Sequence, residues 1–353
     1  MAKNALLDKI RKNSTIKETE ILSESKFFEE KDLVNTNVPA LNIALSADMN
    51  GGFGSGLTLW AGPSKHFKTA FTLMMVKAYQ QKFPDAVTLF YDSEFGTPIS
   101  YFNTFGIDMD RVVHTPLTDV EVLKFDIMAQ LQEVEYGDKL FIAVDSIGNL
   151  ASKKEVDDAL EQKSVADMSR AKQIKSLFRM VTPHLSIKDI PMAAVMHIYM
   201  EQGMYPKAIV SGGTGAYYSA SNIFIVGRQQ EKEDDEIVGY NFILNVEKSR
   251  FVKEKSKIPI EVSFDGGISQ WSGLLDMALE SGHVIKPTNG WYSRTDSKTG
   301  EIEAKKWRKA DTNSAEFWNK IIKDQKFKDW VKTTYSISSS AMVQEHEPLE
   351  EEE

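Results

Sequence analysis

An eight-residue stretch at positions 62–69 has the composition of a phosphate-binding loop. It lies between an apolar, strand-like run at 57–61 and a helix-like run that begins at Lys68. In such a loop, backbone N–H groups and the helix N-terminus point at the phosphates, while Lys68 reaches the terminal phosphates and the Thr69 hydroxyl holds a metal ion. The alternative is an ordinary strand-to-helix turn. The members of the stretch are Gly62, Pro63, Ser64, Lys65, His66, Phe67, Lys68 and Thr69.

Phe67 departs from the usual pattern, which has glycine immediately before the lysine. Phenylalanine carries a Cβ atom and resists positive φ angles. We therefore expect the backbone of this loop to differ from that of the usual phosphate-binding loop.

Two acidic residues follow apolar, strand-like runs. Asp145 comes directly after the run at 140–144, and Glu94 ends the Asp92-Ser93-Glu94 stretch after the run at 87–91. Taken singly, Asp145 could be a helix cap or turn residue and Glu94 a solvated turn residue. In a parallel sheet, however, both would meet the loop at the carboxyl edge. Asp145 would then hold Mg²⁺ and Glu94 would orient an attacking water, as phosphoryl transfer requires.

Three further features have both a structural and a functional interpretation. His197 ends an apolar run and is either a structural or a functional residue, and no second histidine or carboxylate lies at the spacing of a metal site. It precedes a glycine-rich loop at 200–217 that is either a surface insertion or functional. Lys248 and Arg250 end an alternating strand and form either a solvated basic turn or a pair of cations delivered to a phosphate, as an arginine finger would be.

The remaining pattern predicts an α/β fold with a mostly parallel sheet flanked by helices. Apolar runs at 192–196 and 222–226 add strands, and alternating residues at 242–246 and 258–264 predict an antiparallel extension at one edge. The spacing predicts a helix at 68–82 and a charged helical stretch at 152–181. A capping box at Thr118 is expected to begin another helix, which ends near Gly137. Its expected inner face consists of Val122, Phe125, Met128 and Leu131.

Composition excludes several classes of protein. The chain has 353 residues, no cysteine and no apolar run near the roughly 20 residues of a membrane span. Disulfide frameworks and cysteine-based metal sites are therefore excluded, and we expect a cytoplasmic protein without a membrane partner. The net charge is −9, and six acidic residues lie in the last nine positions. No global basic footprint for nucleic acid is present, so any such binding must depend on local charge.

Several segments together resemble the RecA family of recombinases, most closely its phage branch. The resemblance extends from about residue 26 to 335, and the segments that carry it are GPSKHFKT at 62–69, LFYDSEFGTP at 89–98, DSIGNLASKKE at 145–155, GGTG at 212–215, EKSRFVKEKSK at 247–257 and GWYSR at 290–294.

The resemblance implies roles for particular residues. ATP and Mg²⁺ would bind at the loop, Glu94 would activate water, Tyr101 would stack on adenine and His197 would sense the γ-phosphate. Lys248 and Arg250 would act on the nucleotide of the adjacent protomer. The segments at about 152–170 and 200–217 resemble the two DNA-binding loops. Their candidate DNA contacts are Arg170, Lys207, Gly212 and Gly213.

The resulting hypothesis is an ATP-dependent DNA strand-exchange recombinase that forms helical filaments on single-stranded DNA and pairs it with homologous duplex. A single-strand-binding protein and a recombination mediator are implied partners. The alternatives are a ring helicase on the same RecA-type core and a nucleotide-gated DNA-binding scaffold. The expected organisation is an N-terminal helical arm (1–33), an ATPase core (34–272), a small C-terminal α/β module (273–335) and an acidic tail (336–353).

Overall fold

The computed structural model describes residues 5–16, 18–25, 32–162, 169–201, 203–204 and 206–337. Almost all of the expected acidic tail lies outside the described residues. Within them, no helix is both long enough and apolar enough to cross a bilayer.

A nine-stranded mixed sheet forms the centre of the fold, in the order β11-β10-β9-β8-β1-β5-β4-β2-β3. The pairings from β8 to β3 are parallel and those from β8 to β11 are antiparallel, as the apolar and alternating runs predicted. The strands are β1 (Gly56–Ala61), β2 (Val87–Asp92), β3 (Val112–Pro116), β4 (Leu140–Asp145), β5 (Pro191–Met196), β8 (Asn222–Glu233), β9 (Glu236–Ser249), β10 (Lys257–Ser263) and β11 (Gly267–Ile268). A separate hairpin pairs β6 (Ile198–Met200) with β7 (Ala208–Val210).

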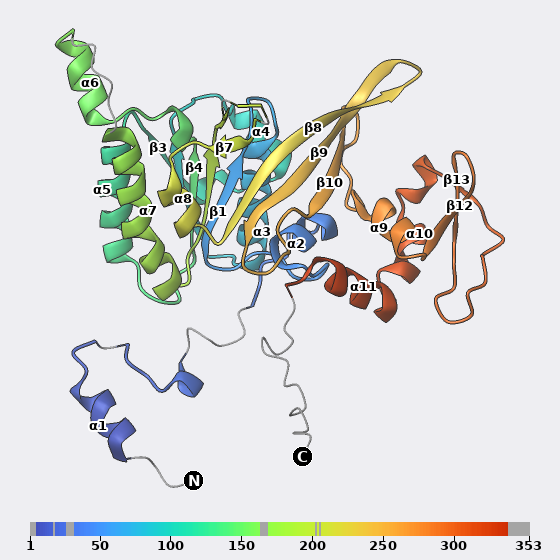
Figure 1. Cartoon of the computed structure of the whole chain (residues 1–353), viewed down its shortest axis with the longest axis horizontal. Coiled ribbons are helices and arrows are strands. Elements are labelled where there is room, and N and C mark those ends of the chain that lie inside the picture. The colour runs from blue at the N-terminus through green and yellow to red at the C-terminus, as the bar shows by residue number, and fades with distance from the viewer. Residues whose placement is uncertain are drawn as a thin grey trace, which may run out of the picture.

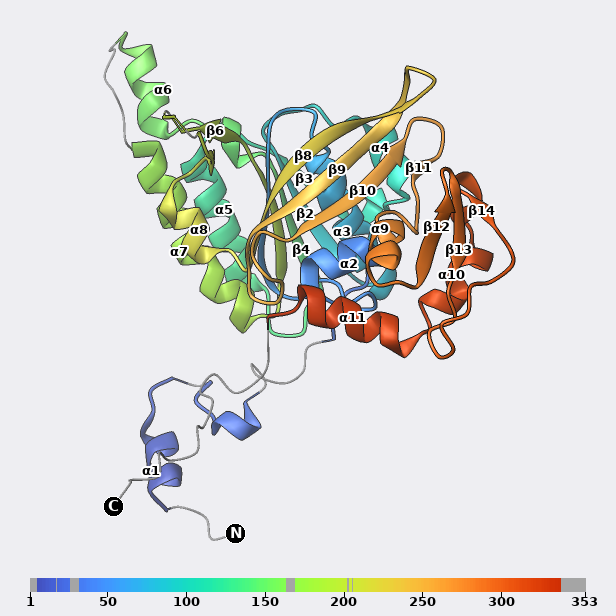
Figure 2. The same ribbon diagram turned by 45° about the vertical axis from the view of Figure 1, so that its right-hand side comes forward.

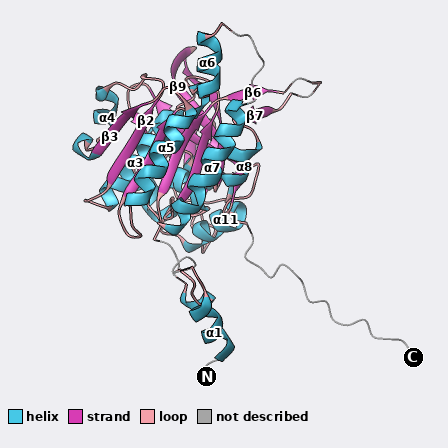
Figure 3. Ribbon diagram, turned by 90° about the vertical axis from the view of Figure 1, so that its left-hand side faces the viewer, coloured by secondary structure: helices cyan, strands magenta, loops and turns pink. Residues whose placement is uncertain are grey.

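Helices cover both faces of this sheet (Figures 1 and 3). On one face, α5 (Val120–Glu133), α7 (Ser169–Ile187) and α8 (Thr214–Ser219) pack on side chains such as Leu59 and Val144. On the other face, α2 (Pro39–Ser46) and α3 (Lys68–Lys82) pack around Trp60. The Trp60 ring stacks on both Phe71 and Phe224, with centroids 5.1 and 4.7 Å away. Residues that alternate along β1 therefore fill two separate cores.

The C-terminal module packs beside the antiparallel edge of the sheet (Figure 2). It contains α9 (Leu274–Glu280), β12 (Val284–Thr288), β13 (Trp291–Arg294), β14 (Trp307–Arg308), η4 (Ala310–Thr312), α10 (Ala315–Ile321) and α11 (Gln325–Tyr335). Its buried aromatic residues, including Phe317 and Phe327, belong to the same apolar cluster as α2 and α3. This continuity fixes the module against the central sheet and its helices.

The other helical elements are α1 (Ala5–Asn13), η1 (Leu22–Glu24), α4 (Ile99–Phe105), η2 (Met109–Arg111), η3 (Ile147–Asn149) and α6 (Lys153–Leu160). Helix α1 buries none of its residues, and its apolar stripe of Leu6, Leu7 and Ile10 is exposed. The expected charged helix at 152–181 is two helices, α6 and α7, which are separated by residues outside the described part of the chain.

The expected start and inner face of helix α5 are wrong. Asp119, not Thr118, is the N-cap, and its carboxylate accepts a 2.9 Å bond from Val122 N. The carboxylate of Glu121 does not complete a capping box but accepts from Lys153 N at 3.0 Å. Val122 and Phe125 are exposed, and Met128 is only partly buried. The buried face consists of Val120, Leu123, Lys124, Ile127 and Leu131, so the expectation is confirmed at Leu131 alone. The expected residues are spaced three apart, whereas an α-helix has 3.6 residues per turn, so they do not stay on one face of the helix.

Replacing the observed cap tests this correction. We expect Asp119→Ala to lower the free energy of unfolding by about 1 kcal/mol, because Val122 N loses its acceptor. Thr118→Ala is the matched control, with an expected change within about 0.5 kcal/mol. Equilibrium urea unfolding of both variants measures the two values. A larger loss for Thr118→Ala than for Asp119→Ala would restore the original capping box.

Candidate active site

The loop at residues 62–67 connects β1 to α3 at the carboxyl edge of the parallel strands. A side chain would be strained at its first residue, because Gly62 has a φ of 157° and a Cβ atom there would lie 3.0 Å from the Val226 carbonyl oxygen of the neighbouring strand. Gly62 N donates to Met196 O of β5 at 3.3 Å. The loop is thus held between the two strands that flank β1, and it leads directly into the N-terminus of α3.

Phe67 adopts the backbone conformation that its side chain was expected to prevent. Its φ of 61° and ψ of 15° are left-handed, and Lys65 has the same φ. The expected departure from the usual loop backbone is therefore wrong at this position. The left-handed conformation costs about 1–2 kcal/mol for a non-glycine residue. The Phe67 ring stacks on Phe242 at 4.8 Å and meets Phe71 edge-on at 5.5 Å. Such contacts, together with partial burial of the ring, offset the strain.

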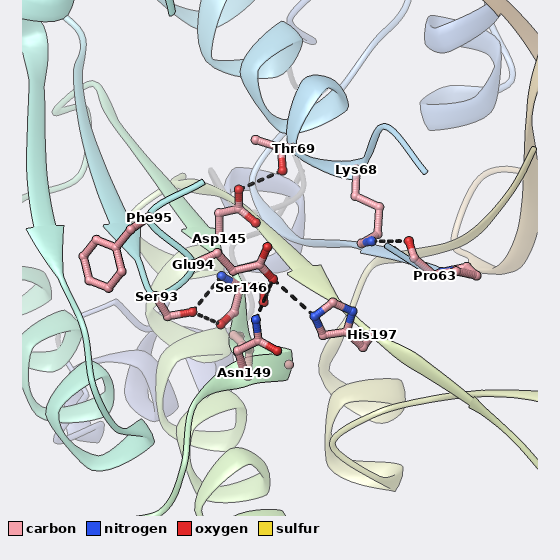
Figure 4. A network of polar contacts seen from close by, with 12 residues as sticks. Pro63, Lys68, Thr69, Ser93, Glu94, Phe95, Asp145, Ser146, Asn149 and His197 are labelled. Atoms are coloured by element: carbon pink, nitrogen blue, oxygen red, sulfur yellow. Dashed lines mark hydrogen bonds and ion pairs between the residues drawn. The ribbon is translucent and has the colours of Figure 1, made fainter. Parts of the chain in front are cut away.

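Thr69 and Asp145 lie in direct contact beneath the loop (Figure 4). The Thr69 hydroxyl donates to Asp145 Oδ2 at 2.7 Å. Burial raises the pKa of Asp145 to about 6, helped by the charges of Glu94 and Asp92, while the Thr69 bond and the Lys68 charge oppose the shift. The other carboxylate oxygen, Oδ1, is buried and has no hydrogen-bond partner within the described residues. A hydroxyl and a buried carboxylate oxygen are hard ligands that suit Mg²⁺.

Lys68 is buried at the start of α3. Its ammonium donates to the Pro63 carbonyl of the same loop at 2.6 Å (Figure 4). Burial lowers the pKa of Lys68, and the nearby charges of Glu94 and Asp145 oppose that shift. Among the described residues, the amine has one hydrogen-bond acceptor, the neutral Pro63 carbonyl, and an anionic phosphate is a stronger partner for it.

Glu94 is the centre of a network that the sequence did not predict. Its Oε1 atom accepts from Ser146 Oγ at 2.6 Å and from Asn149 Nδ2 at 3.0 Å, and it lies 3.2 Å from His197 Nε2 (Figure 4). A carboxylate oxygen only accepts hydrogen bonds, so the imidazole donates. Ser146 follows Asp145 directly and could have been suspected on that ground. No sequence signal pointed to Asn149.

The backbone around Glu94 is fixed by its neighbours on β2 and β4. Asp92 Oδ1 accepts from Glu94 N at 3.0 Å and from Phe95 N at 2.8 Å. The Ser93 hydroxyl donates to Ser146 O at 2.6 Å, and Ser146 N donates back to it at 3.0 Å. These contacts join the ends of two adjacent strands and thereby set the position of the Glu94 side chain.

A pocket of about 320 Å³ opens beside these groups. It brings together most of the residues that the sequence singled out for nucleotide binding. They are Ser64, Lys65, His66, Phe67, Lys68, Thr69, Glu94, Tyr101 and His197. Asp145 adjoins the pocket through Thr69. The pKa of His66 is lowered, chiefly by burial and also by the charges of Arg228 and Lys68.

Lys248 and Arg250 are not among the residues that line this pocket. Lys248 Nζ donates to Tyr217 O at 2.6 Å and to Tyr218 O at 3.3 Å, and it lies over the Tyr217 ring. Arg250 is exposed after the end of β9. Any contact of these cations with a nucleotide would therefore be made outside this pocket, and their assignment to a neighbour's nucleotide stays a prediction.

The four candidate DNA contacts lie in different settings. Lys207 is exposed beside the β6–β7 hairpin, and Gly212 and Gly213 have φ angles of 99° and 71° before α8. Arg170 points inward to the segment after β4: its Nε donates to Leu150 O at 2.6 Å, and its Nη2 donates to Gly148 O at 2.5 Å. The assignment of these four residues as DNA contacts stays a prediction.

Comparison with known proteins assigns the chain to a family. The family model for the RecA N-terminal domain matches residues 3–269. The chain belongs to the RecA family. A second model, for the C-terminal domain of the bacteriophage T4 recombination and repair protein, matches residues 271–331. The resemblance to RecA recombinases and to their phage branch is therefore confirmed.

Individual relatives agree with this assignment. The recombination and repair protein of Enterobacteria phage T4 is 52% identical over 338 residues, which cover 95% of this chain and 86% of that protein. Protein RecA of Paracoccus denitrificans is 24% identical over 277 residues, covering 77% of this chain and 74% of the relative. Protein RecA of Bacteroides thetaiotaomicron is 25% identical over 278 residues, covering 77% and 81%. The RecA relationship thus includes the sheet and loop described above.

Two substitutions at Phe67 test how the loop is held. Phe67→Ala keeps the left-handed strain and loses the stacking, whereas Phe67→Gly loses the stacking and relieves the strain. We expect Phe67→Gly to be more stable than Phe67→Ala by about 1 kcal/mol, the strain relief being partly offset by the greater freedom of unfolded glycine. Thermal or urea unfolding compares the two. Equal stability would contradict the left-handed conformation of Phe67.

Proposed function

We propose that this chain is an ATP-dependent recombinase that forms helical filaments on single-stranded DNA and exchanges strands with homologous duplex. The observation that carries the proposal is the convergence of Lys68, Thr69, Glu94 and Asp145 at one sheet edge. Membership of the RecA family and 52% identity to the T4 recombination and repair protein support it. The match of residues 271–331 to the T4 C-terminal domain favours a recombinase over a ring helicase.

Different residues of the pocket would have different roles in phosphoryl transfer. The loop amides and Lys68 would neutralise phosphate charge, and Tyr101 would stack on the base. Thr69 and Asp145 would hold Mg²⁺, which supplies further neutralisation of the developing charge. Glu94 would orient the attacking water, and His197, which shares its oxygen, would respond to the terminal phosphate.

Assembly would complete the site. Arg250 and Lys248 would reach the nucleotide of an adjacent protomer, and the exposed apolar stripe of α1 would contact a neighbour. The segments at 152–170 and 200–217 would bind DNA. The proposal divides the chain into a core at 34–272 and a module at 273–335. It also includes a single-strand-binding protein and a recombination mediator as partners. Electron micrographs with single-stranded DNA and ATP test it directly: a continuous helical filament supports it, and closed rings would contradict it.

Glu94→Gln separates an ATPase from a nucleotide-gated scaffold. We expect DNA-stimulated ATP hydrolysis to fall at least about 100-fold, because the amide no longer acts as a base toward water. ATP binding should persist, since Lys68 and the loop are unchanged. Lys68→Ala is the companion variant, in which ATP turnover should be abolished through loss of the phosphate-binding cation. Hydrolysis that is equal in wild type and Glu94→Gln would refute the catalytic assignment.

Mixing two inactive variants tests whether Arg250 acts on a neighbour. Arg250→Ala retains Glu94, and Glu94→Gln retains Arg250, so an equimolar mixture contains interfaces with both groups intact. If Arg250 acts across a head-to-tail interface, random assembly restores about a quarter of the wild-type rate of DNA-stimulated hydrolysis. A mixture that remains as inactive as its components, while both are folded and form filaments, would show that Arg250 does not act in trans.

A further inference from the structure

Arg228, on strand β8, holds one carbonyl group of the loop at 62–67 from outside the loop. Its Nη1 atom donates to Lys65 O at 3.2 Å. The two preceding carbonyl groups accept from side chains of the loop itself and of the first residue of α3. Arg228 is not among the residues that line the nucleotide pocket. Its contact therefore ties the loop to the antiparallel part of the sheet, on a side that the pocket does not include.

One cross-strand pair supports both left-handed residues of the loop. Lys65 and Phe67 each have a φ of 61°, which is unfavourable for residues other than glycine. In the antiparallel register of β8 and β9, Arg228 lies opposite Phe242, so their side chains share one face of the sheet. Phe242 stacks on the Phe67 ring, and Arg228 donates to the Lys65 carbonyl. The same step of the sheet thus stabilises the loop at both unfavourable positions.

An aromatic ring fixes the position of the Arg228 guanidinium. Its Cζ atom lies 4.8 Å from the centroid of the Tyr240 ring. Tyr240 in turn contacts Phe242, with ring centroids 6.0 Å apart. An exposed arginine samples many rotamers, and the contact with an aromatic face restricts them. A lysine at this position would keep the charge but lose the planar group that stacks.

The contact with the Lys65 carbonyl also sets the direction of the amide that follows it. The peptide bond between Lys65 and His66 is trans, so its C=O and N–H groups point in opposite directions. With the carbonyl turned toward Arg228, the His66 N–H is turned to the other side. Loop amides of this kind are the groups that bind phosphate. Arg228 therefore selects one orientation of a group that a nucleotide would use.

We propose that Arg228 is a positioning residue that orders the loop for phosphate binding, by holding the Lys65 carbonyl and thereby the His66 amide in one orientation. This inference rests on the proposed function and adds to it a residue from the antiparallel edge of the sheet. A loop that is ordered in advance loses less conformational freedom when its ligand binds. Arg228 thus increases the affinity for ATP without touching it, and because Arg228 is exposed, its replacement removes no packed core.

Calorimetric titration of the full chain with ATP and Mg²⁺, in the absence of DNA, tests this proposal. We expect Arg228→Ala to raise the Kd about three- to tenfold, the worth of one hydrogen bond. Arg228→Lys should recover only part of the affinity, because the stacked planar group is missing. Gln229→Ala is the matched control and should keep the wild-type Kd, since Gln229 is exposed on the opposite face of β8. A wild-type Kd in Arg228→Ala would overturn the inference.

A second background separates support of the loop backbone from direct contact with phosphate. Lys65→Gly removes the steric penalty of the left-handed conformation, so the loop depends less on Arg228. We therefore expect Arg228→Ala to raise the Kd by a smaller factor in the Lys65→Gly background than in the wild type. An equal factor in both backgrounds would show that Arg228 acts independently of the Lys65 backbone and would overturn the inference. Wild-type protein without measurable ATP binding would refute the proposed function itself, a result distinct from either variant outcome.

Discussion

The in-register parallel pairing of β2 with β4 is the constraint on which the rest of the site depends. It sets Asp92 opposite Asp145 at the ends of the two strands. The next residues, Ser93 and Ser146, then bond to each other through hydroxyl and backbone groups. Because side chains alternate along a strand, a slip of one residue would turn Asp145 away from Thr69. The position of Glu94 and the contact between α3 and β4 both follow from this one register.

Burial of charge at the sheet edge is partly compensated by neighbouring groups: Asp145 Oδ2 accepts from Thr69, and Lys68 lies near the charges of Glu94 and Asp145. Asp145 is nearly inaccessible, and burial raises its pKa to about 6. Burial also lowers the pKa of Lys68, so the two shifts express the same cost of removing charge from water. The two apolar clusters on either side of the sheet hold these groups in place. Burial disfavours the charged forms of Asp145 and Lys68. A divalent cation beside the carboxylate and a polyanion beside the amine would stabilise those charged forms.

The sequence predicted best where a single physical rule applied. Continuous apolar runs predicted parallel strands, and parallel strands placed Glu94 and Asp145 at the edge where Lys68 and Thr69 begin a helix. It failed at Phe67 because the rings that stabilise its backbone, Phe71 and Phe242, include one from a strand far away in the sequence. Local propensity contains no information about such a partner.

The errors at α5 and at Asn149 have other causes. Thr118 and Asp119 are both good caps, and the Glu121 side chain that would complete a capping box at Thr118 instead accepts from Lys153 N, a residue distant in the sequence. Asn149 lies 55 residues from Glu94 in the sequence, and an isolated asparagine has no periodicity or motif that would single it out. Contacts of this kind follow from the fold and are not visible before it.

Net charge limits how a chain of this composition can bind a polyanion. Because the net charge of the chain is −9, a single copy at a distance from DNA would be repelled by it. Screening reduces such repulsion beyond about 8 Å at physiological ionic strength, so the charges near the contact decide the outcome. Within the described part of the chain, Lys207 is exposed beside the β6–β7 hairpin and offers one such charge, whereas the guanidinium of Arg170 is engaged by carbonyl oxygens. One or a few phosphate contacts per copy bind weakly, and their free energies add only when copies line up along one strand. Under the proposed function, filament formation is therefore a requirement of the electrostatics and not merely a consequence of the shared fold.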